Sequence, residues 1–595
     1  MRARFRVLYA KLVQSQKLSR LMGTFACAAV LTGPTHSAVC PIPQLLGKSP
    51  TRLVVVVPGT GQDQLQWGSF LSALKNEPQS NSVAWLVFDH KIQFSSIGSA
   101  YSISTELASC VDEKVKANGY KSVTLIGHSI GGMLARRAYL EAAGAFPDKV
   151  ASHDSWANKV DRILLLASVN KGIGPDADWW GIRASWLNWL LRNFPHPRFV
   201  LEDVALGSDF VADIRIAWIR HFGSLIQSHG NPTHSAAPHV VQFWGTEDSI
   251  VTERDNADLE AFNGPVLVRV SGATHGDLNR LDLRSTPDPA SRWALFRHHL
   301  FDEIPPNASP PVYEPRRVLF IARGIRDSSN SEWVSDLRVR AAKFYGAANI
   351  EDIEYGYFSA AHFALRPQRA KNIPRFRDRY AQRLAENPRT EFDFIGHSNG
   401  TYIFGQSLMS TPSMRFGNVV LAAPVLPTDF NWTRLFDLQQ VRALRYDTAS
   451  GDWPVGILCP ILRAFGFTDV GPSGVVLFGD GTLADSRLKK VGWYDGDHSA
   501  AIRSDLKNGI DNREHLLAFA INGSDVDSGE QLSSELGAMQ QVSRATPYVV
   551  WTLLAFVVFK LIRKLFYDGR VFLSRRNVAY LLCTALATYV ILDIV

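Results

Sequence analysis

Two serines stand in the sequence contexts best suited to chemistry. Ser129 is the centre of residues 127–131 (GHSIG), and Ser398 is the centre of residues 396–400 (GHSNG). A Gly-x-Ser-x-Gly pattern arises by chance roughly 0.2 times in a chain of this length, taking Gly and Ser at about 7% each. Two copies therefore indicate two nucleophilic serines.

Each serine lies between an apolar run and a helical pattern. Residues 122–126 and 392–395 predict buried strands that lead into the two serines, and residues 132–143 predict a helix after the first of them. A serine in such a turn needs glycine two positions away on either side, because a β-carbon there would collide with the strand or the helix. The following backbone N–H groups, of Ile130 and Asn399, are placed at a helix N-terminus to stabilise an oxyanion.

A serine needs a base, and the base needs an orienting acid. We expect the order Ser, acid, His at successive strand ends, where an open α/β sheet gathers its chemistry. The sequence supplies two such sets, which are Ser129, Asp248 and His275 in the first half and Ser398, Asp452 and His498 in the second. The nearest rival acids are Glu247, Asp447 and Asp497.

The elements around these residues alternate between strands and helices. The run LVVVV at residues 53–57 is typical of a strand buried on both faces. Further strands are predicted at residues 83–88, 162–167, 240–244 and 266–270, and in the second half at 317–322, 353–358, 419–422, 441–446 and 489–494, with a helix at 102–117. This alternation predicts α/β domains, each with a mostly parallel sheet and helices on both faces.

Both halves resemble α/β-hydrolase domains, and the first resembles a lipase or esterase with a GHSxG elbow. The resemblance covers about residues 50–300 and 316–525. It implies that the turn after the first strand supplies a second oxyanion donor, which would be Thr60 or Gly61 in the first half and Gly324 or Ile325 in the second. Many relatives have His-Gly at this turn, where this chain has Pro-Gly and Arg-Gly. The departure affects the mechanism little, because the donor is a backbone N–H.

The two halves differ in the length of chain between nucleophile and acid. That stretch is more than twice as long in the first half, and the excess is rich in tryptophan, with Trp179, Trp180, Trp186 and Trp189. We interpret it as a lid over the first site, with a buried cap helix as the alternative. An apolar cover of either kind favours acyl chains over sugars or charged peptides.

Both ends of the chain have the composition of targeting or membrane segments. Residues 1–49 begin with a basic, acid-free leader and an apolar stretch at 21–32, which predicts a secretory signal, with an organelle transit peptide as the alternative. Residues 545–595 contain apolar runs at 545–559 and 577–592, separated by a basic loop. They predict a transmembrane hairpin whose loop is cytoplasmic, with the hydrolase domains on the exported side. The alternative is a helical pair that packs on the protein or lies in the interface.

Proline divides the body of the chain. Residues 303–315 contain five prolines and predict a stiff linker between a domain at 50–302 and a domain at 316–525, and residues 526–544 form a second linker. We therefore expect two sites that act independently.

Composition limits the remaining possibilities. The chain has 595 residues, 46% hydrophobic and 20% charged, so most of it folds. Its net charge of +7 belongs to the ends, since residues 1–50 carry seven basic and no acidic side chains, and the body is mildly acidic. This argues against nucleic-acid binding. Five scattered cysteines are too few for a disulfide framework or a zinc site.

The sequence thus predicts a membrane-anchored tandem serine hydrolase that acts without a metal or organic cofactor on an ester of lipidic character. Acyl transfer and amide hydrolysis remain open, because they share the acyl-enzyme step. A membrane-tethered binding or scaffold protein with one or both folds silent is the alternative from another class.

Overall fold

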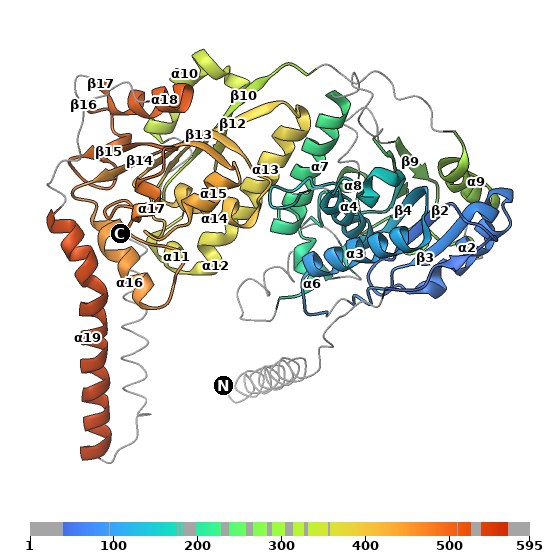
Figure 1. Cartoon of the computed structure of the whole chain (residues 1–595). Helices are drawn as coiled ribbons and strands as arrows, with labels where there is room; N and C mark the ends of the chain where they lie inside the picture. The colour runs from blue at the N-terminus through green and yellow to red at the C-terminus, as the bar shows by residue number, and fades with distance from the viewer. Residues whose placement is uncertain are drawn as a thin grey trace, which may run out of the picture.

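The computed structural model describes residues 40–93, 96–150, 152–174, 178–179, 182–183, 198–227, 237–256, 266–282, 288–303, 313–325, 331–354, 358–507, 510–524 and 537–568. Two large β-sheets organise this part of the chain (Figure 1). One sheet belongs to the first half, residues 40–303, and the other to the second half, residues 313–524.

The first sheet has seven strands, and all neighbours are parallel except β1 and β3. Across the sheet the order is β1 (Gln44–Leu45), β3 (Val83–Val87), β2 (Arg52–Val57), β4 (Ser122–His128), β5 (Val160–Leu166), β8 (His239–Gly245) and β9 (Val266–Val270). Five residues of β2 are buried, because helices cover both faces of the sheet.

The second sheet has six strands, all parallel. The order is β11 (Ile350–Ile353), β10 (Arg316–Ala322), β12 (Thr390–His397), β13 (Phe416–Ala422), β14 (Val441–Ala449) and β15 (Leu488–Tyr494), which repeats the order of the six parallel strands of the first sheet. The mostly parallel sheets are as predicted. One strand was misplaced, since β11 is Ile350–Ile353 and not 353–358.

Helices cover both faces of the first sheet. They are α2 (Gly68–Lys75), α3 (Ala100–Asn118), α4 (Ile130–Ala142), α6 (Val200–Asp203), α7 (Asp209–Gln227), α8 (Glu253–Asn256) and α9 (Pro289–Phe301). Alternate residues of β2 face opposite ways, so Val54 and Val56 pack with α2 and α9, whereas Leu53, Val55 and Val57 pack with α3, α4 and α7.

The second sheet is covered in the same way. Its helices are α10 (Glu332–Tyr345), α11 (Ala360–Ala364), α12 (Arg366–Arg369), α13 (Ile373–Glu386), α14 (Asn399–Ser410), α15 (Trp432–Asp437), α16 (Cys459–Ala464), α17 (Asp480–Leu483) and α18 (Asn512–Asn522). Leu319 and Ile321 of β10 pack with α10 and α18, and Val318 and Phe320 pack with α13 and α14. Two short antiparallel pairs lie outside the large sheets among the described residues, with β6 (Asp178–Trp179) beside β7 (Ile182–Arg183) and β16 (Leu506–Lys507) beside β17 (Ile510–Asp511).

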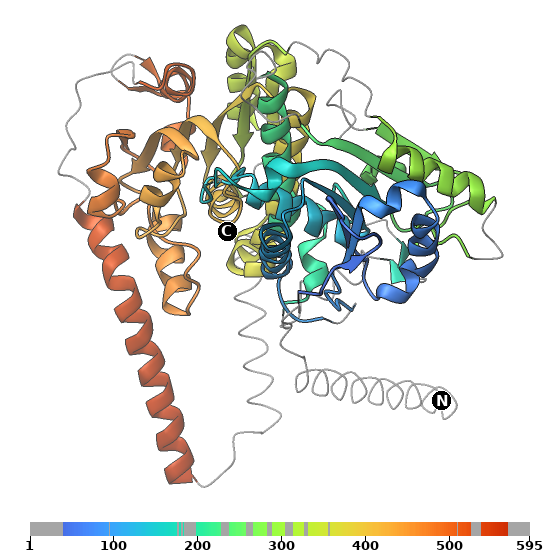
Figure 2. The same ribbon diagram turned by 45° about the vertical axis from the view of Figure 1, so that its right-hand side comes forward.

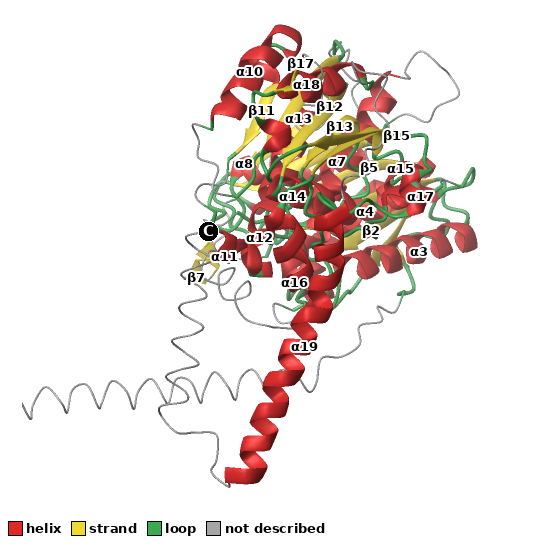
Figure 3. Cartoon of the chain, turned by 90° about the vertical axis from the view of Figure 1, so that its left-hand side faces the viewer, coloured by secondary structure: helices red, strands yellow, loops and turns green. Residues whose placement is uncertain are grey.

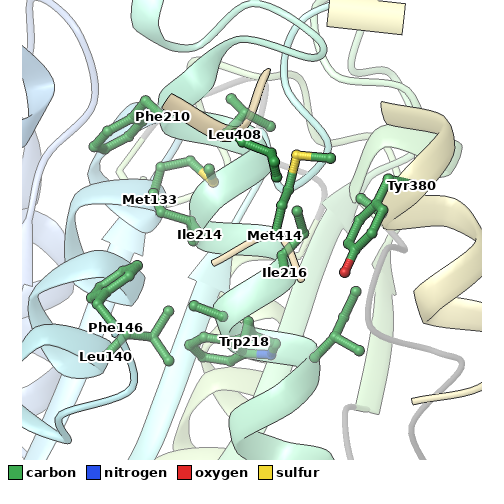
Figure 4. Close-up of a cluster of buried hydrophobic side chains, with 14 of the residues drawn as sticks. Met133, Leu140, Phe146, Phe210, Ile214, Ile216, Trp218, Tyr380, Leu408 and Met414 are labelled. Atoms are coloured by element: carbon green, nitrogen blue, oxygen red, sulfur yellow. The ribbon is translucent and has the colours of Figure 1, made fainter. Parts of the chain in front are cut away.

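One apolar cluster spans both halves, because α7 of the first half packs on α13 of the second (Figures 1 and 2). In Figure 4, Trp218 on α7 lies among side chains of both halves, including Tyr380 and Met414. The carboxylate of Asp213 accepts a hydrogen bond from the backbone N–H of Ser413 at 3.0 Å. This differs from the expectation of two domains held apart by a stiff linker, of which residues 304–312 lie outside the described residues.

A disulfide joins Cys40, before the first sheet, to Cys110 on α3. The cysteine count predicted no disulfide framework, and one bridge is not a framework, but the pairing itself was missed. It closes a loop of 70 residues around β1, β2 and β3, and so fastens the start of the described chain to the body.

The helix α19 (Gly537–Asp568) begins against the second half and then extends away from it (Figures 1 and 3). Near its start, Met539 packs at the core and the Gln540 amide donates to the carbonyl of Val475 at 3.1 Å. Farther along, Tyr548, Trp551 and Phe556 are exposed.

The predicted membrane segments are only partly described. The run at 545–559 lies within α19, and the run at 577–592 lies outside the described residues, as do residues 1–39 of the predicted leader. Among the helices of the described residues, none combines the length and apolarity needed to cross a bilayer. The predicted transmembrane hairpin is therefore not supported by this part of the chain.

Candidate active site

Both serines occupy a sharp turn between a strand and a helix. Strand β4 ends at His128 and α4 begins at Ile130, which leaves Ser129 between them with φ of 53°. Ser398 lies between β12 and α14 with φ of 51°. Such left-handed values cost a non-glycine residue of order 1–3 kcal/mol, and they turn the side chain out of the sheet.

The flanking glycines make this turn possible in the way that the sequence predicts. A β-carbon on Gly127 would lie 2.4 Å from the Cα of Gly132, and one on Gly131 would lie 2.1 Å from the carbonyl oxygen of Val57. Both contacts are with backbone atoms, which cannot move aside. The pattern is therefore a requirement of the turn.

In the first half the three predicted residues form one hydrogen-bonded chain. The Nε2 atom of His275 lies 2.9 Å from the Oγ of Ser129, and its Nδ1 atom lies 2.9 Å from the Oδ2 of Asp248. The second oxygen of Asp248 accepts the backbone N–H groups of Ile250 and Val251, each at 2.9 Å. Asp248 is thus fixed in place and orients His275, whereas its rival Glu247 is exposed.

Two backbone N–H groups beside Ser129 are available to an oxyanion. Within the described chain, neither the amide of Thr60 nor that of Ile130 has a hydrogen-bond acceptor. Gly61 was the other candidate in the first turn, but its amide donates to the carbonyl of Ile92 at 2.8 Å. Thr60 and Ile130 therefore remain as the donors.

The second half contains the same residues in a looser arrangement. The Nδ1 atom of His498 lies 2.8 Å from the Oδ2 of Asp452, whose other oxygen accepts the N–H of Val455 at 3.0 Å. No hydrogen bond joins Ser398 to His498 among the described residues, and Ser398 is only 3% exposed. The structure thus joins Asp452 to His498, whereas the predicted contact between His498 and Ser398 is not formed among the described residues.

The rival acids of the second half have other partners. Asp447 pairs with Arg445 at 2.9 Å, and Asp497 pairs with Arg503. The sequence-predicted Asp452 is thus the acid that contacts the histidine.

The turn after β10, which contains Gly324 and Ile325, lies beside Ser398 as the turn at Gly59 lies beside Ser129. Among the described residues the amides of Ile325 and Asn399 have no acceptor, and Gly324 lies against the elbow, where a β-carbon would be 3.1 Å from the Cβ of Ser398. The side chain of Asn399 is fully buried, and neither its oxygen nor its nitrogen has a partner in the described chain. The corresponding residue of the first half is the apolar Ile130.

Comparison with protein-family models gives a match in the first half of the chain. Residues 54–288 match the model of a family described as the alpha/beta hydrolase family. The first half of the chain has the α/β-hydrolase fold.

Solved hydrolase structures overlay on less than half of the chain. A lipase-esterase related protein from Clostridium acetobutylicum is 12% identical, with 44% of this chain and 98% of that chain covered and a TM-score of 0.28. Est1E from Butyrivibrio proteoclasticus is 13% identical, with 43% and 91% covered and a TM-score of 0.27. The lipase BlEst2 from Bacillus licheniformis is 13% identical, with 40% and 91% covered and a TM-score of 0.26. No curated protein sequence matches the chain.

Only part of the long insertion of the first half lies among the described residues. Its last part forms α7, which contacts the second half. Of the predicted lid tryptophans, Trp179 lies in β6. The other three, Trp180, Trp186 and Trp189, lie outside the described residues. The lid stays a prediction, but α7 accounts for part of the excess length.

Two residues of this site were missed by the sequence reasoning. His128 and His397 directly precede Ser129 and Ser398, and the Nε2 atom of each hydrogen-bonds the backbone carbonyl of the histidine predicted as the base, His275 or His498. The signal was present, since histidine occupies the same position in both elbows. As for metals, no group of three or more His, Cys, Asp or Glu side chains in the described ranges is arranged to hold one.

Proposed function

We propose that the protein is a serine hydrolase that cleaves carboxylic esters with apolar acyl chains. The observation that carries the proposal is the unbroken chain of hydrogen bonds from Ser129 through His275 to Asp248, with both links at 2.9 Å. A serine held in this way loses its proton to the histidine as it attacks a carbonyl.

The reaction follows from this geometry. Ser129 Oγ forms a bond to the ester carbonyl carbon while its proton passes to Nε2 of His275. The amides of Thr60 and Ile130 donate to the resulting oxyanion. When the tetrahedral species collapses, the ester C–O bond breaks and the leaving alcohol takes the proton from His275. A water then attacks the acyl-Ser129 ester by the same steps, which releases the acid and restores the serine.

An apolar acyl chain suits the residues around this nucleophile. Ile130, next to Ser129, is apolar and 1% exposed, and the insertion that follows the elbow is rich in tryptophan. Apolar walls select substrates by the apolar area that they bury.

We further propose that the second half is a second α/β-hydrolase domain with its own site. The repeated strand order, the elbow at Ser398 and the His498–Asp452 hydrogen bond of 2.8 Å support it. Because catalytic hydrogen bonds in unliganded sites are often long and tighten with substrate, Ser398 is expected to turn toward His498 when an ester binds.

We also propose that the chain works at a membrane, on the exported side. The exposed aromatic side chains of α19, followed by Lys560 and Arg563, support contact with a lipid interface. The Cys40–Cys110 disulfide supports an oxidising compartment. Sedimentation with anionic vesicles tests the proposed membrane contact, since a chain that ends at residue 536, and so lacks α19, should no longer bind the vesicles.

Hydrolysis of p-nitrophenyl esters of increasing chain length tests the central proposal on the full chain. We expect activity that rises with acyl length. In a Ser398→Ala background, where only the first site is active, it should fall by about 10³-fold or more in Ser129→Ala, because the residual rate then comes only from binding and the oxyanion donors. Ser398→Ala is the matched control and should leave the Ser129 activity. Wild-type rates in Ser129→Ala would reject the assignment.

A further inference from the structure

The imidazole of His128 is buried between three segments of the active site. The residue ends β4, directly before Ser129, and is 2% exposed. Its Nε2 atom lies 2.8 Å from the backbone carbonyl oxygen of His275. Because a carbonyl oxygen only accepts, Nε2 must carry the hydrogen and donate it. The ring therefore holds the backbone of the residue whose own ring is the base.

This ring is neutral and makes few other polar contacts. Burial disfavours the imidazolium and lowers the pKa of His128 to about 3, with a further lowering by His275. Its Nδ1 atom has no hydrogen-bond partner among the described residues. The bond to the His275 carbonyl is thus the polar interaction that offsets the cost of burying an imidazole.

The opposite edge of the ring lies against the oxyanion turn. A β-carbon on Gly59 would be only 2.6 Å from Nδ1 of His128, so the ring fills the space that a side chain there would take. The rings of His128 and His275 are 5.1 Å apart between centroids. One side chain therefore touches the turn at Gly59, the elbow and the loop of the base.

The second half repeats this arrangement. The Nε2 atom of His397 lies 3.1 Å from the carbonyl oxygen of His498, and a β-carbon on Gly324 would be 2.7 Å from Nδ1 of His397. The surroundings of the two sites differ, with Ile130 in one and Asn399 in the other. An apolar side chain would fill the same volume without burying a polar ring, so the recurrence points to a role for the hydrogen bond.

We propose that His128 is a positioning residue that holds the His275 backbone in register with Ser129 and the oxyanion turn, and that His397 does the same for His498. The inference rests on the proposed function. A backbone shift at His275 would lengthen the 2.9 Å contact between its Nε2 and Ser129 Oγ. Misplacement by about 1 Å can cost 10²-fold in rate. Since His128 does not touch the reacting atoms, its loss should lower kcat and leave KM nearly unchanged.

Two substitutions of the full chain test this, both in a Ser398→Ala background so that one site is read. His128→Phe fills the space without a donor, and we expect kcat for a p-nitrophenyl ester to fall about 10- to 100-fold with KM within about twofold. His128→Gln places an amide donor near the former Nε2 and should recover most of kcat. Equal rates in His128→Phe and in the unsubstituted site would overturn the proposal.

His221 offers a matched control. Burial also lowers the pKa of His221, to about 4. Its Nε2 atom, however, lies 3.0 Å from the hydroxyl of Tyr139, and this pair is outside the candidate site. His221→Phe should therefore leave kcat unchanged. If His128→Phe does not fold, His128→Asn replaces it, because its shorter amide does not reach the carbonyl. An equal loss of kcat in His128→Asn and His128→Gln would then reject the proposal.

Different results would reject the proposed function and the positioning role of His128. If the wild-type chain neither hydrolyses esters nor reacts with a fluorophosphonate at Ser129, the proposed function is wrong. If the wild-type chain does both and His128→Phe reacts at the same rate, only the positioning role is wrong.

Discussion

The guanidinium of Arg215 on α7 lies 2.6 Å from the carboxylate of Asp378 on α13, so an ion pair joins the two halves of the chain. Arg215 is 1% exposed and Asp378 is 16% exposed, so water screens the pair weakly. Nearby, buried Asp213 pairs with Arg137 at 3.2 Å, and burial raises the pKa of Asp213. The interface between the halves is therefore built like a protein interior.

Removal of Arg215 should destabilise the whole chain. Arg215→Ala leaves the Asp378 carboxylate without its ion-pair partner, although the hydrogen bond from the Gln382 amide at 2.6 Å is kept. Loss of one partner of a buried ion pair typically costs about 3 kcal/mol. Urea unfolding followed by circular dichroism measures it. The control is Lys116→Ala, since Lys116 pairs with Asp112 at 2.6 Å on the exposed surface of α3, where the loss should stay below about 1 kcal/mol. Equal effects of the two substitutions would show that the interface contributes no special stability.

Reduction of the disulfide should lower stability. A bridge that closes 70 residues restricts the unfolded chain and contributes about 4 kcal/mol in the loop-entropy estimate. We expect Cys110→Ser to shift the urea midpoint downward and dithiothreitol to produce the same shift in the wild type. If dithiothreitol shifted the midpoint of Cys110→Ser further, another disulfide would be responsible.

Acid should destabilise the protein partly through His128. The pKa of a histidine is ordinarily 6.5, and that of His128 is about 3 in the folded chain. The unfolded chain therefore binds a proton at this residue below about pH 6.5, whereas the folded chain binds it only near pH 3. The free energy of unfolding therefore falls as the pH drops from about 6.5 toward 3, by at most about 2 kcal/mol at pH 5 from this group. His275 and Asp248 are the neighbouring titratable groups that act on the pKa of His128, which His275 lowers and Asp248 raises.

His128→Gln isolates this contribution, because glutamine does not titrate. Urea unfolding at pH 7 and pH 5 should give a smaller difference for the variant than for the wild type. The same difference in both proteins would mean that the buried ring is not the group that responds.

Asn399 should limit the stability of the second half. Its buried amide has no partner among the described residues, and each such polar group costs about 1–3 kcal/mol. Asn399→Ile copies the first half and should raise the free energy of unfolding by about 1 kcal/mol or more. The reverse change, Ile130→Asn, should lower it. A loss of stability in Asn399→Ile would mean that the amide is satisfied by a bound group.

The central strands and the grouping of Ser129, His275 and Asp248 could be predicted from the sequence because local patterns determine them, and in the second half the same patterns brought His498 to Asp452. The run LVVVV is typical of a strand buried on both faces, and the glycines around Ser129 are typical of a sharp turn between a strand and a helix. The order of acid and histidine then follows from the strand ends. The edge strand β11 was misplaced in the sequence analysis, because its residues 350–353 (IEDI) include two acidic side chains and the aromatic stretch at 355–358 has an equally strand-like composition.

The interface and the disulfide could not be predicted, because they depend on residues far apart in the chain. The apolar face of α7 looks the same whether it covers a substrate or packs on α13, and only the folded structure distinguishes the two. Cys40 and Cys110 are brought together by three intervening strands. The role of His128 was hidden for the same reason, since its partner is the backbone of His275 and not a side chain.

The most direct test is the position and rate of fluorophosphonate labelling on the full chain, read by mass spectrometry of its peptides. The reagent modifies only a serine that a base activates, so we predict an adduct on Ser129 and a labelling rate at least about 10²-fold lower in His275→Ala, with the fold checked by circular dichroism. No adduct on Ser129 in the folded wild type, or an undiminished rate in His275→Ala, would contradict the assignment of this site as a serine hydrolase centre.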